Sequence, residues 1–372
     1  MEAFALSCCK TLFTFPHTAL SIRLSPMRFL TRMIAVTVLA ASAAAGVWAM
    51  GSVPQGDPPR LSFQILTGSS AGTYYPIGQM LASIISHPPG VARCEAEGRC
   101  GPAGLFAAAR ASEGSVANLR AVAEGRVESA IAQGDLAADA LAGRGEFEKG
   151  GPLSNLRAIA ALFPETVHVV VPAASTLQTI ADLKGKRVSI DVPGSGTHAT
   201  ARAILKAFKI AERRVTLSTD NVETSMQKLV AGELDAFFFV GGAPLGVLEE
   251  AARQGQVRLL PVDGKGAETL LGEKETMQRA VIPEGTYEGL GAVETVSVPA
   301  VWVVSQSASP DLVFAITRAL WNPDNRPLLD SGHPMGRFIR LDTAQANLPL
   351  PLHEGALRFY LGEKVPTLAP WR

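Results

Sequence analysis

The sequence lacks the motifs that mark common catalytic and cofactor sites. It contains no HExxH metal-binding pattern, no histidine-rich cluster and no Walker A phosphate loop. Gly72 and Gly78 have the wrong spacing for a dinucleotide-binding fingerprint. Around Ser195 the full GxSxG elbow of an α/β-hydrolase is missing. We therefore expect no catalytic residue, no metal site and no cofactor, and the protein is not predicted to be an enzyme.

An excess of one charge sign is also lacking. The 372 residues carry 34 basic and 34 acidic side chains, for a net charge of zero. Without the first 49 residues, 30 basic and 33 acidic side chains remain, for a net charge of −3. This balance favours neither a nucleic-acid-binding surface nor a polybasic membrane patch. With 47% hydrophobic residues, the chain can bury the cores of two domains of ordinary size.

Long apolar runs are absent except near the N-terminus. Residues 33–49 (MIAVTVLAASAAAGVWA) carry no charge, follow two arginines, and end in a small-x-small pattern that suits signal peptidase. We interpret residues 1–49 as a cleavable signal peptide, with Met27 as an alternative native start. The rival interpretation is an uncleaved membrane anchor, for which the run is slightly short. The pattern predicts a protein exported to the periplasm.

Cysteine is scarce, and only two of the four cysteines follow the leader. Cys94 and Cys100 lie close together in a stretch rich in glycine and proline. In an exported protein an even pair of this kind predicts a local disulfide bond that closes a surface loop. A zinc site would need two further ligands nearby, and none is close.

Strand-like and helix-like segments alternate through most of residues 61–361. Several strand-like runs are apolar at every position, as in residues 236–240. This alternation predicts an α/β fold with parallel sheets covered by helices on both faces. Residues 167–171 and 298–304 are expected to be extended crossings between two lobes. The predicted lobe I therefore comprises residues 55–171 and 295–372, and the predicted lobe II comprises residues 172–294.

Two stretches of small and hydroxyl-bearing residues each separate an expected strand from an expected helix. They are residues 67–78 (TGSSAGTYYPIG) and residues 191–197 (DVPGSGT). At such a turn, backbone N–H groups and the positive end of the helix dipole can face a carboxylate or a phosphate. Either stretch alone is also consistent with an ordinary turn that caps a helix. Two matching stretches, one in each expected lobe, favour a shared ligand site in a cleft.

The expected ligand contacts come from these two stretches and from two further strand ends. Gln133 is included because its amide can donate to a ligand oxygen and accept from an ammonium group. One of the two adjacent tyrosines is expected to form an aromatic wall of the site, while the other lies in the core. The expected ligand-binding residues are Ser69, Ser70, Thr73, Tyr74, Tyr75, Gln133, Gly194, Ser195, Gly196, Thr197, Phe239 and Gly241.

These segments together resemble the TAXI-type solute-binding subunits of tripartite ATP-independent periplasmic (TRAP) transporters. The resemblance covers about residues 61–361. It rests on Gln133 with Asp135 and on seven segments, all in the same order: AGTYYPIG (71–78), GSVANL (114–119), ALFPETVHVVV (161–171), ADLKGKRVSIDVPGSGTHATARAIL (181–205), AGELDAFFFVGGAP (231–244), IPEGTY (282–287) and LPLPLHEGALRFY (348–360).

The resemblance implies a type II periplasmic-binding-protein fold, with two lobes joined by two hinge strands. Such a protein captures a small organic anion, here a dicarboxylate or a glutamate-like molecule, and delivers it to TRAP membrane permease subunits. The family's first loop is often richer in glycine, whereas this chain has Ser69 and Ala71, so ligand identity is not carried over. The loop between the two cysteines resembles an insertion relative to the family pattern.

Two other functions remain open from the sequence. One is a periplasmic ligand-sensing module that partners a sensor kinase and uses the same two lobes. The other is an exported hydrolase that uses Ser195 as its nucleophile.

Overall fold

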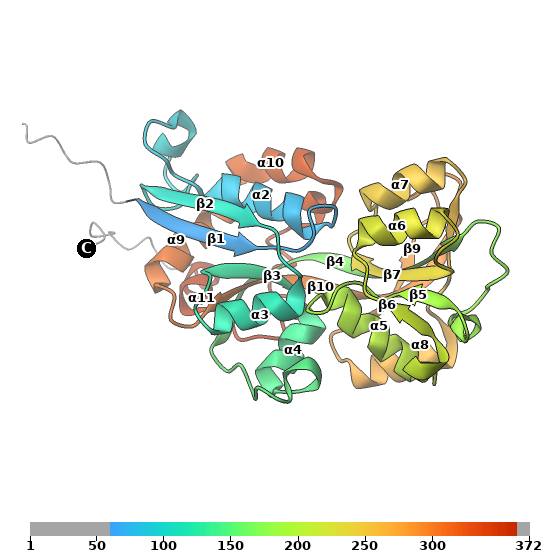
Figure 1. The fold of residues 1–372 in the computed structure, drawn as a ribbon. Coiled ribbons are helices and arrows are strands. Elements are labelled where there is room, and N and C mark those ends of the chain that lie inside the picture. The colour runs from blue at the N-terminus through green and yellow to red at the C-terminus, as the bar shows by residue number, and fades with distance from the viewer. Residues whose placement is uncertain (1–59, 363–372) are drawn as a thin grey trace, which may run out of the picture. The chain divides into compact units, whose positions relative to one another are not determined.

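The computed structural model describes residues 60–362, which belong to one structural unit (Figure 1). The predicted signal peptide and the alternative start at Met27 lie outside the described residues. Within the described range, no helix combines the length and the apolar character that a bilayer span requires.

The described residues contain a ten-stranded mixed sheet. Its main path follows the order β2-β1-β3-β10-β4-β7-β5-β6, while β8 pairs with β4 and β9 pairs with β10. The strands are β1 (Leu61–Leu66), β2 (Leu105–Arg110), β3 (Ser129–Gln133), β4 (Leu156–Pro172), β5 (Arg187–Ser189), β6 (Thr216–Ser218), β7 (Ala236–Gly241), β8 (Val257–Leu259), β9 (Gln278–Ile282) and β10 (Val293–Ser305).

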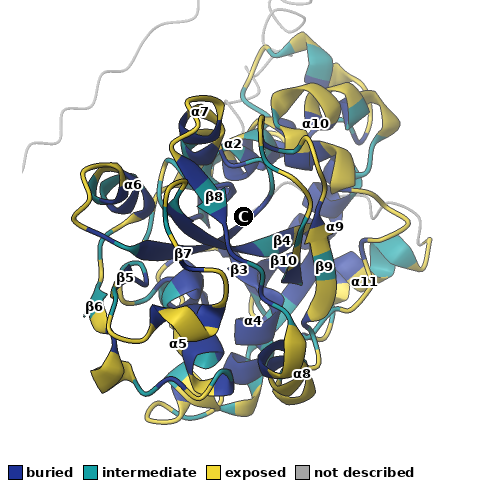
Figure 2. Cartoon of the chain, turned by 90° about the vertical axis from the view of Figure 1, so that its right-hand side faces the viewer, coloured by how far each residue is buried: buried dark blue, intermediate teal, exposed yellow. Residues whose placement is uncertain are grey.

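Helices pack against both faces of the sheet, and their outward sides are exposed (Figure 2). The α-helices are α2 (Tyr74–Ile85), α3 (Ser115–Ala123), α4 (Gly134–Ala142), α5 (Gly196–Ala207), α6 (Val222–Val230), α7 (Gly246–Arg253), α8 (Gly264–Glu273), α9 (Pro310–Leu320), α10 (Arg326–Gly332) and α11 (Glu354–Tyr360). Short 3₁₀ turns are η1 (Ala92–Glu95), η2 (Gly145–Phe147), η3 (Ile180–Leu183), η4 (Glu212–Arg214), η5 (Pro323–Asn325) and η6 (Pro334–Phe338).

Two strands of the sheet are buried along their whole length. Every residue of β3 and β7 is buried, as expected for strands that are covered by helices on both faces. The outer parts of the sheet are parallel, with β1 beside β2 and β3, and β5 beside β6 and β7. The α/β alternation predicted from the sequence is confirmed in these parts.

The middle of the sheet differs from the prediction. Residues 167–171, expected to form an extended crossing, are the end of the single 17-residue strand β4. β4 pairs antiparallel with both β10 and β7, so the sheet is mixed rather than parallel. Pro164 faces Pro299 in the register of β4 and β10. Because proline has no backbone N–H, this point of the ladder has fewer hydrogen bonds, although the strands continue through it.

Four apolar clusters form the core, and they fall into two groups along the chain. Two clusters use buried residues up to Phe163 and from Ala300 onward, and the other two use buried residues from Val167 to Val298. We call residues 60–163 and 300–362 the first half and residues 167–298 the second half. The lobe boundaries predicted from the sequence stay a prediction.

The predicted disulfide bond is confirmed. Cys94 and Cys100 are bonded, with their Cα atoms 5.3 Å apart. Both cysteines are buried in the segment that connects α2 to β2, where Cys94 is part of η1. The bond therefore closes a short loop of the first half.

Candidate functional site

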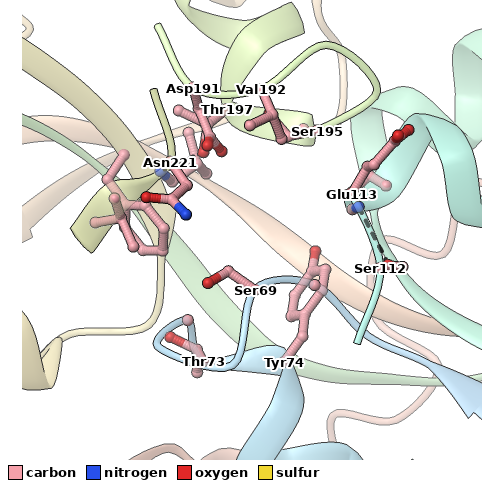
Figure 3. A pocket seen from close by; sticks show the side chains of 18 of the residues that line it. Ser69, Thr73, Tyr74, Ser112, Glu113, Asp191, Val192, Ser195, Thr197 and Asn221 are labelled. Atoms are coloured by element: carbon pink, nitrogen blue, oxygen red, sulfur yellow. Dashed lines mark hydrogen bonds between the residues drawn. The ribbon is translucent and has the colours of Figure 1, made fainter. Parts of the chain in front are cut away.

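A cavity of about 590 Å³ lies between residues of the two halves. Its walls come from the turns at the ends of β1, β2, β5 and β6, and from residues of β3, β4 and β7 (Figure 3). The lining residues are Gly68, Ser69, Ser70, Gly72, Thr73, Tyr74, Ala111, Ser112, Glu113, Gly114, Ser115, Gln133, Glu165, Asp191, Val192, Pro193, Ser195, Gly196, Thr197, Asn221, Val222, Glu223, Phe239 and Val240.

Four helices begin at this cavity. The first residue of α2, α3, α5 and α6 lines it, namely Tyr74, Ser115, Gly196 and Val222. The positive dipole ends of these helices therefore lie near the same space. The strand-to-helix turns predicted from residues 67–78 and 191–197 are two of these four starts.

Most residues expected to contact a ligand line the cavity. They are Ser69, Ser70, Thr73, Tyr74, Gln133, Ser195, Gly196, Thr197 and Phe239. Their role as ligand contacts stays a prediction. The structure therefore brings together two turns that are more than 110 residues apart in the sequence.

Three expected residues do not line the cavity. Tyr75 follows Tyr74 in α2, and successive helical residues point about 100° apart, so only Tyr74 faces the cavity. The carbonyl of Gly194 instead accepts hydrogen bonds from the N–H groups of Val116 and Ala117, at 3.0 and 3.1 Å. Gly241 packs against the Phe239 ring: a Cβ added to Gly241 would lie 2.5 Å from Phe239 Cε1.

The hydroxyl groups at the cavity already accept hydrogen bonds from the backbone. Ser195 Oγ accepts from His198 N at 3.0 Å and thereby caps α5, and Thr197 Oγ1 accepts from Val240 N at 3.0 Å. Each hydroxyl also carries one donor proton. Burial raises the pKa of Asp191, and this carboxyl accepts from both of these side chains, which lowers the pKa in part. An acceptor oxygen of a ligand would therefore share these two protons with Asp191.

Thr73 links the two halves beside the cavity. Its Oγ1 accepts a hydrogen bond from Gly242 N at 3.0 Å. The backbone carbonyl of Gly194 makes a second link by accepting from α3. The halves are therefore in contact around the cavity, as in a closed arrangement.

A buried carboxyl group forms one wall of the cavity. Glu165 on β4 is 1% exposed and accepts a hydrogen bond of 2.6 Å from the hydroxyl of Tyr74. Burial raises the pKa of Glu165 well above its ordinary value of 4.5, and the Tyr74 hydrogen bond opposes this rise only in part. Burial also raises the pKa of Tyr74, which stays protonated.

The amide of Gln133 is an unpaired polar group at this site. Gln133 is 2% exposed, and its Oε1 has no hydrogen-bond partner among the described residues. This oxygen lies next to the start of α5, since a Cβ on Gly196 would come within 2.0 Å of it. A buried acceptor without a donor is costly, so a ligand donor here would be stabilising.

Carboxylates are the charged groups that the sequence reasoning missed. Glu113, Glu165, Asp191 and Glu223 line the cavity, whereas no Lys, Arg or His is among the described residues that line it. Asp191 stands at the first position of a predicted turn, and Glu223 is in the first turn of a helix after Asn221. Asn221 and Glu223 follow the end of β6, so a search for polar residues just after each strand would have found them. Nothing local marks Glu165, because it lies inside a long strand.

No group of three or more His, Cys, Asp or Glu side chains suited to a metal ion occurs in residues 60–362.

Comparisons with known proteins agree with this architecture. A sequence model described as the NMT1-like family matches residues 65–363. The structure is similar to MatC from Rhodopseudomonas palustris with bound malate, at 15% identity and a TM-score of 0.50, over 82% of this chain and 98% of that one. It is also similar to the alkanesulfonate-binding protein SsuA from Xanthomonas axonopodis pv. citri bound to MOPS, at 17% identity and a TM-score of 0.41, over 84% of this chain and 87% of that one.

At these identities the structural likeness shows the fold alone. The fold is the mixed α/β fold of type II periplasmic binding proteins. The fold class predicted from the sequence is therefore confirmed.

Proposed function

The chain belongs to the NMT1-like family, and from this premise we propose that it is an extracytoplasmic solute receptor of a TRAP-type transporter. The ligand is a small organic anion, either a dicarboxylate or a glutamate-like molecule, which the receptor delivers to the membrane permease unchanged. The predicted signal peptide supports export to the periplasm. The malate bound to the similar MatC structure is consistent with an organic acid of this size.

One observation carries the proposal most directly. The turns of residues 67–78 and 191–197, which the sequence singled out as anion cradles, line the same cavity. Four helix starts and the hydroxyl groups of Ser195 and Thr197 surround this space. A carboxylate there would receive charge-assisted hydrogen bonds worth roughly 1.5–3 kcal/mol each.

The proposed mechanism is closure around the ligand. The ligand first binds donors of the first half, and donors of the second half then complete its contacts. The ligand shifts the population toward the closed form only by the difference in its affinity for the two forms. The contact of Thr73 with Gly242 joins the two halves, and we expect it to break when the ligand is released.

A thermal-shift screen of organic acids tests this function. A bound acid at 100 times its Kd stabilises the folded protein by about 2.7 kcal/mol, which raises the unfolding temperature. The double substitution Ser195→Ala with Thr197→Ala should abolish most of that rise. Ser309→Ala is the matched control, because Ser309 caps α9 through Leu312 N and does not line the cavity.

Two results would count against the proposal. One is a screen in which no organic acid raises the unfolding temperature. The other is an undiminished rise in the double variant, which would place the ligand elsewhere.

A further inference from the structure

The negative charge of the cavity lining is not balanced by a cationic side chain among the described lining residues. Asp191 and Glu223 line it on the second-half side, and neither forms an ion pair with any Lys or Arg in residues 60–362. The described lining contains no cationic side chain that could take this role. Carboxylates that face a cavity without a counter-ion are suited to a cation supplied by the ligand.

Asp191 has an unusual backbone conformation. It follows β5 with a φ of 69°, a left-handed conformation that aspartate and asparagine tolerate better than most residues. Figure 3 shows its carboxyl group beside Thr197 and Asn221, across the cavity from Ser69. Burial raises the pKa of Asp191, and the charge of the nearby Glu223 acts in the same direction.

Glu223 reaches the cavity from the first turn of α6. This helix is capped by Asn221, whose side-chain oxygen accepts from Thr224 N at 2.9 Å. The hydroxyl of Ser69 donates to Glu223 Oε2 at 3.3 Å, so the carboxylate also contacts the first half. The two carboxylates therefore approach the same space from two different turns.

Gln133 is a second, independent observation, because its buried side-chain oxygen lacks a hydrogen-bond donor within residues 60–362. Its buried Oε1 lies against Gly196 and lacks a hydrogen-bond partner among the described residues. Asp191 interacts with Ser195 and Thr197, the residues on either side of Gly196. Gln133 and Asp191 thus flank the start of α5, and both offer acceptors.

We propose that the ligand carries a protonated amine, which binds between Asp191, Glu223 and Gln133 Oε1. The inference rests on the proposed function and narrows it to amino-carboxylates. The carboxylate of such a ligand faces the helix starts of the first half, while its ammonium group neutralises the acidic side of the cavity. A dicarboxylate without an amine would leave both carboxylates unpaired and would add like charge.

Matched pairs of compounds provide the test. The purified full chain is titrated by calorimetry with L-glutamate and glutarate, L-aspartate and succinate, and γ-aminobutyrate and butyrate. In at least one pair, the amine-bearing member should bind at least tenfold more tightly than its partner. If the members without an amine bind equally well or better, the amine inference is wrong and the organic-anion receptor stands. Binding of no member of any pair would overturn both.

Conservative substitutions of the two carboxylates test whether they bind the ammonium group of the ligand. Asp191→Asn keeps a residue that tolerates the left-handed backbone, and Glu223→Gln keeps the size of the side chain. Each should weaken the best amine-bearing compound at least tenfold and leave its deaminated partner unchanged or tighter. Glu284→Gln, on an exposed turn, is the control and should change neither affinity. Equal losses for both members of the pair would contradict an amine subsite at these residues, because a general structural defect does not distinguish them.

Discussion

At the scale of single residues, Glu165 is the most unusual group of the site. Its carboxyl is buried in β4 and accepts a hydrogen bond from the hydroxyl of Tyr74. Since burial raises its pKa in the folded state, the folded protein holds this proton more tightly than the unfolded chain does. The penalty for ionising Glu165 therefore grows as the pH rises from about 4.5, its ordinary value, toward the folded pKa.

We predict that Glu165→Gln stabilises the ligand-free protein at neutral pH. The amide can still accept from Tyr74, but it has no charge to lose or gain. The unfolding temperature of the variant should exceed that of the parent at pH 7 to 8, and the gain should vanish as the pH falls to about 4. Each 1 kcal/mol corresponds to roughly 2–4 °C for a domain of this size.

Thermal unfolding at pH values from 4 to 8 measures this difference. Glu284→Gln, which changes an exposed carboxylate, should show no comparable pH-dependent gain. A Glu165→Gln variant that is less stable than the parent at pH 7 to 8 would mean that the ionised carboxylate stabilises the fold.

The residue scale also shows why two adjacent tyrosines differ. The sequence pattern could not assign the cavity to one of them, because both lie at a predicted helix start. In the structure α2 begins at Tyr74, which directs that hydroxyl to Glu165 and places Tyr75 outside the lining. Which tyrosine faces the cavity depends on the exact first residue of α2, and a single sequence does not define helix ends that closely.

At the scale of elements, the start of α5 lies close against the opposite wall of the cavity. Gly196 is the first residue of this helix, and a Cβ there would meet Gln133 Oε1 at 2.0 Å and Ser115 Oγ at 2.8 Å. Both neighbours belong to the first half. Glycine therefore lets α5 approach the opposite wall.

We predict that Gly196→Ala weakens ligand binding at least tenfold, because the methyl group displaces Gln133 and holds α5 away from the first half. A tenfold loss corresponds to about 1.4 kcal/mol. Calorimetry with the best compound from the matched pairs measures the effect.

Gly272→Ala is the matched control. Gly272 is a helical glycine in α8 with nothing within 4 Å of an added Cβ. Alanine there should stabilise the protein by roughly 0.5–1 kcal/mol and leave affinity unchanged. Unchanged affinity in both variants would show that α5 does not need this close approach to bind the ligand.

At the scale of the whole molecule, a buried ion-pair cluster joins the two halves beside the cavity. Lys274, just after α8, pairs with Asp139 on α4 and lies 3.6 Å from a carboxylate oxygen of Asp135. The Lys274 side chain is 17% exposed, and the two aspartates are 10% and 1% exposed. The charges are therefore largely shielded from water.

We predict that Lys274→Met destabilises the protein by about 3–5 kcal/mol, because it leaves the buried Asp135 without its cation and Asp139 with only the more exposed Arg144 at 3.4 Å. Urea unfolding measures the loss. Adding Asp135→Asn and Asp139→Asn should recover much of it, since the unpaired charges are then removed.

Lys206→Met serves as the control, because Lys206 pairs with Glu273 at the surface, with side-chain exposures of 78% and 52%. Exposed pairs contribute little, so this variant should change stability by less than about 1 kcal/mol. Similar losses in the two methionine variants would show that burial does not strengthen the Lys274 contact.

The sequence alone determined the α/β class, the disulfide bond and the two turns that line the cavity. These features depend on local patterns: apolar runs in strands, small residues before helices, and cysteines close in the chain. The tertiary structure decided the antiparallel middle of the sheet, the position of Tyr74 and the acidic wall formed by Glu165, Asp191 and Glu223. Those features depend on which distant strands pair and in what register, and single-sequence periodicity carries no information on that pairing.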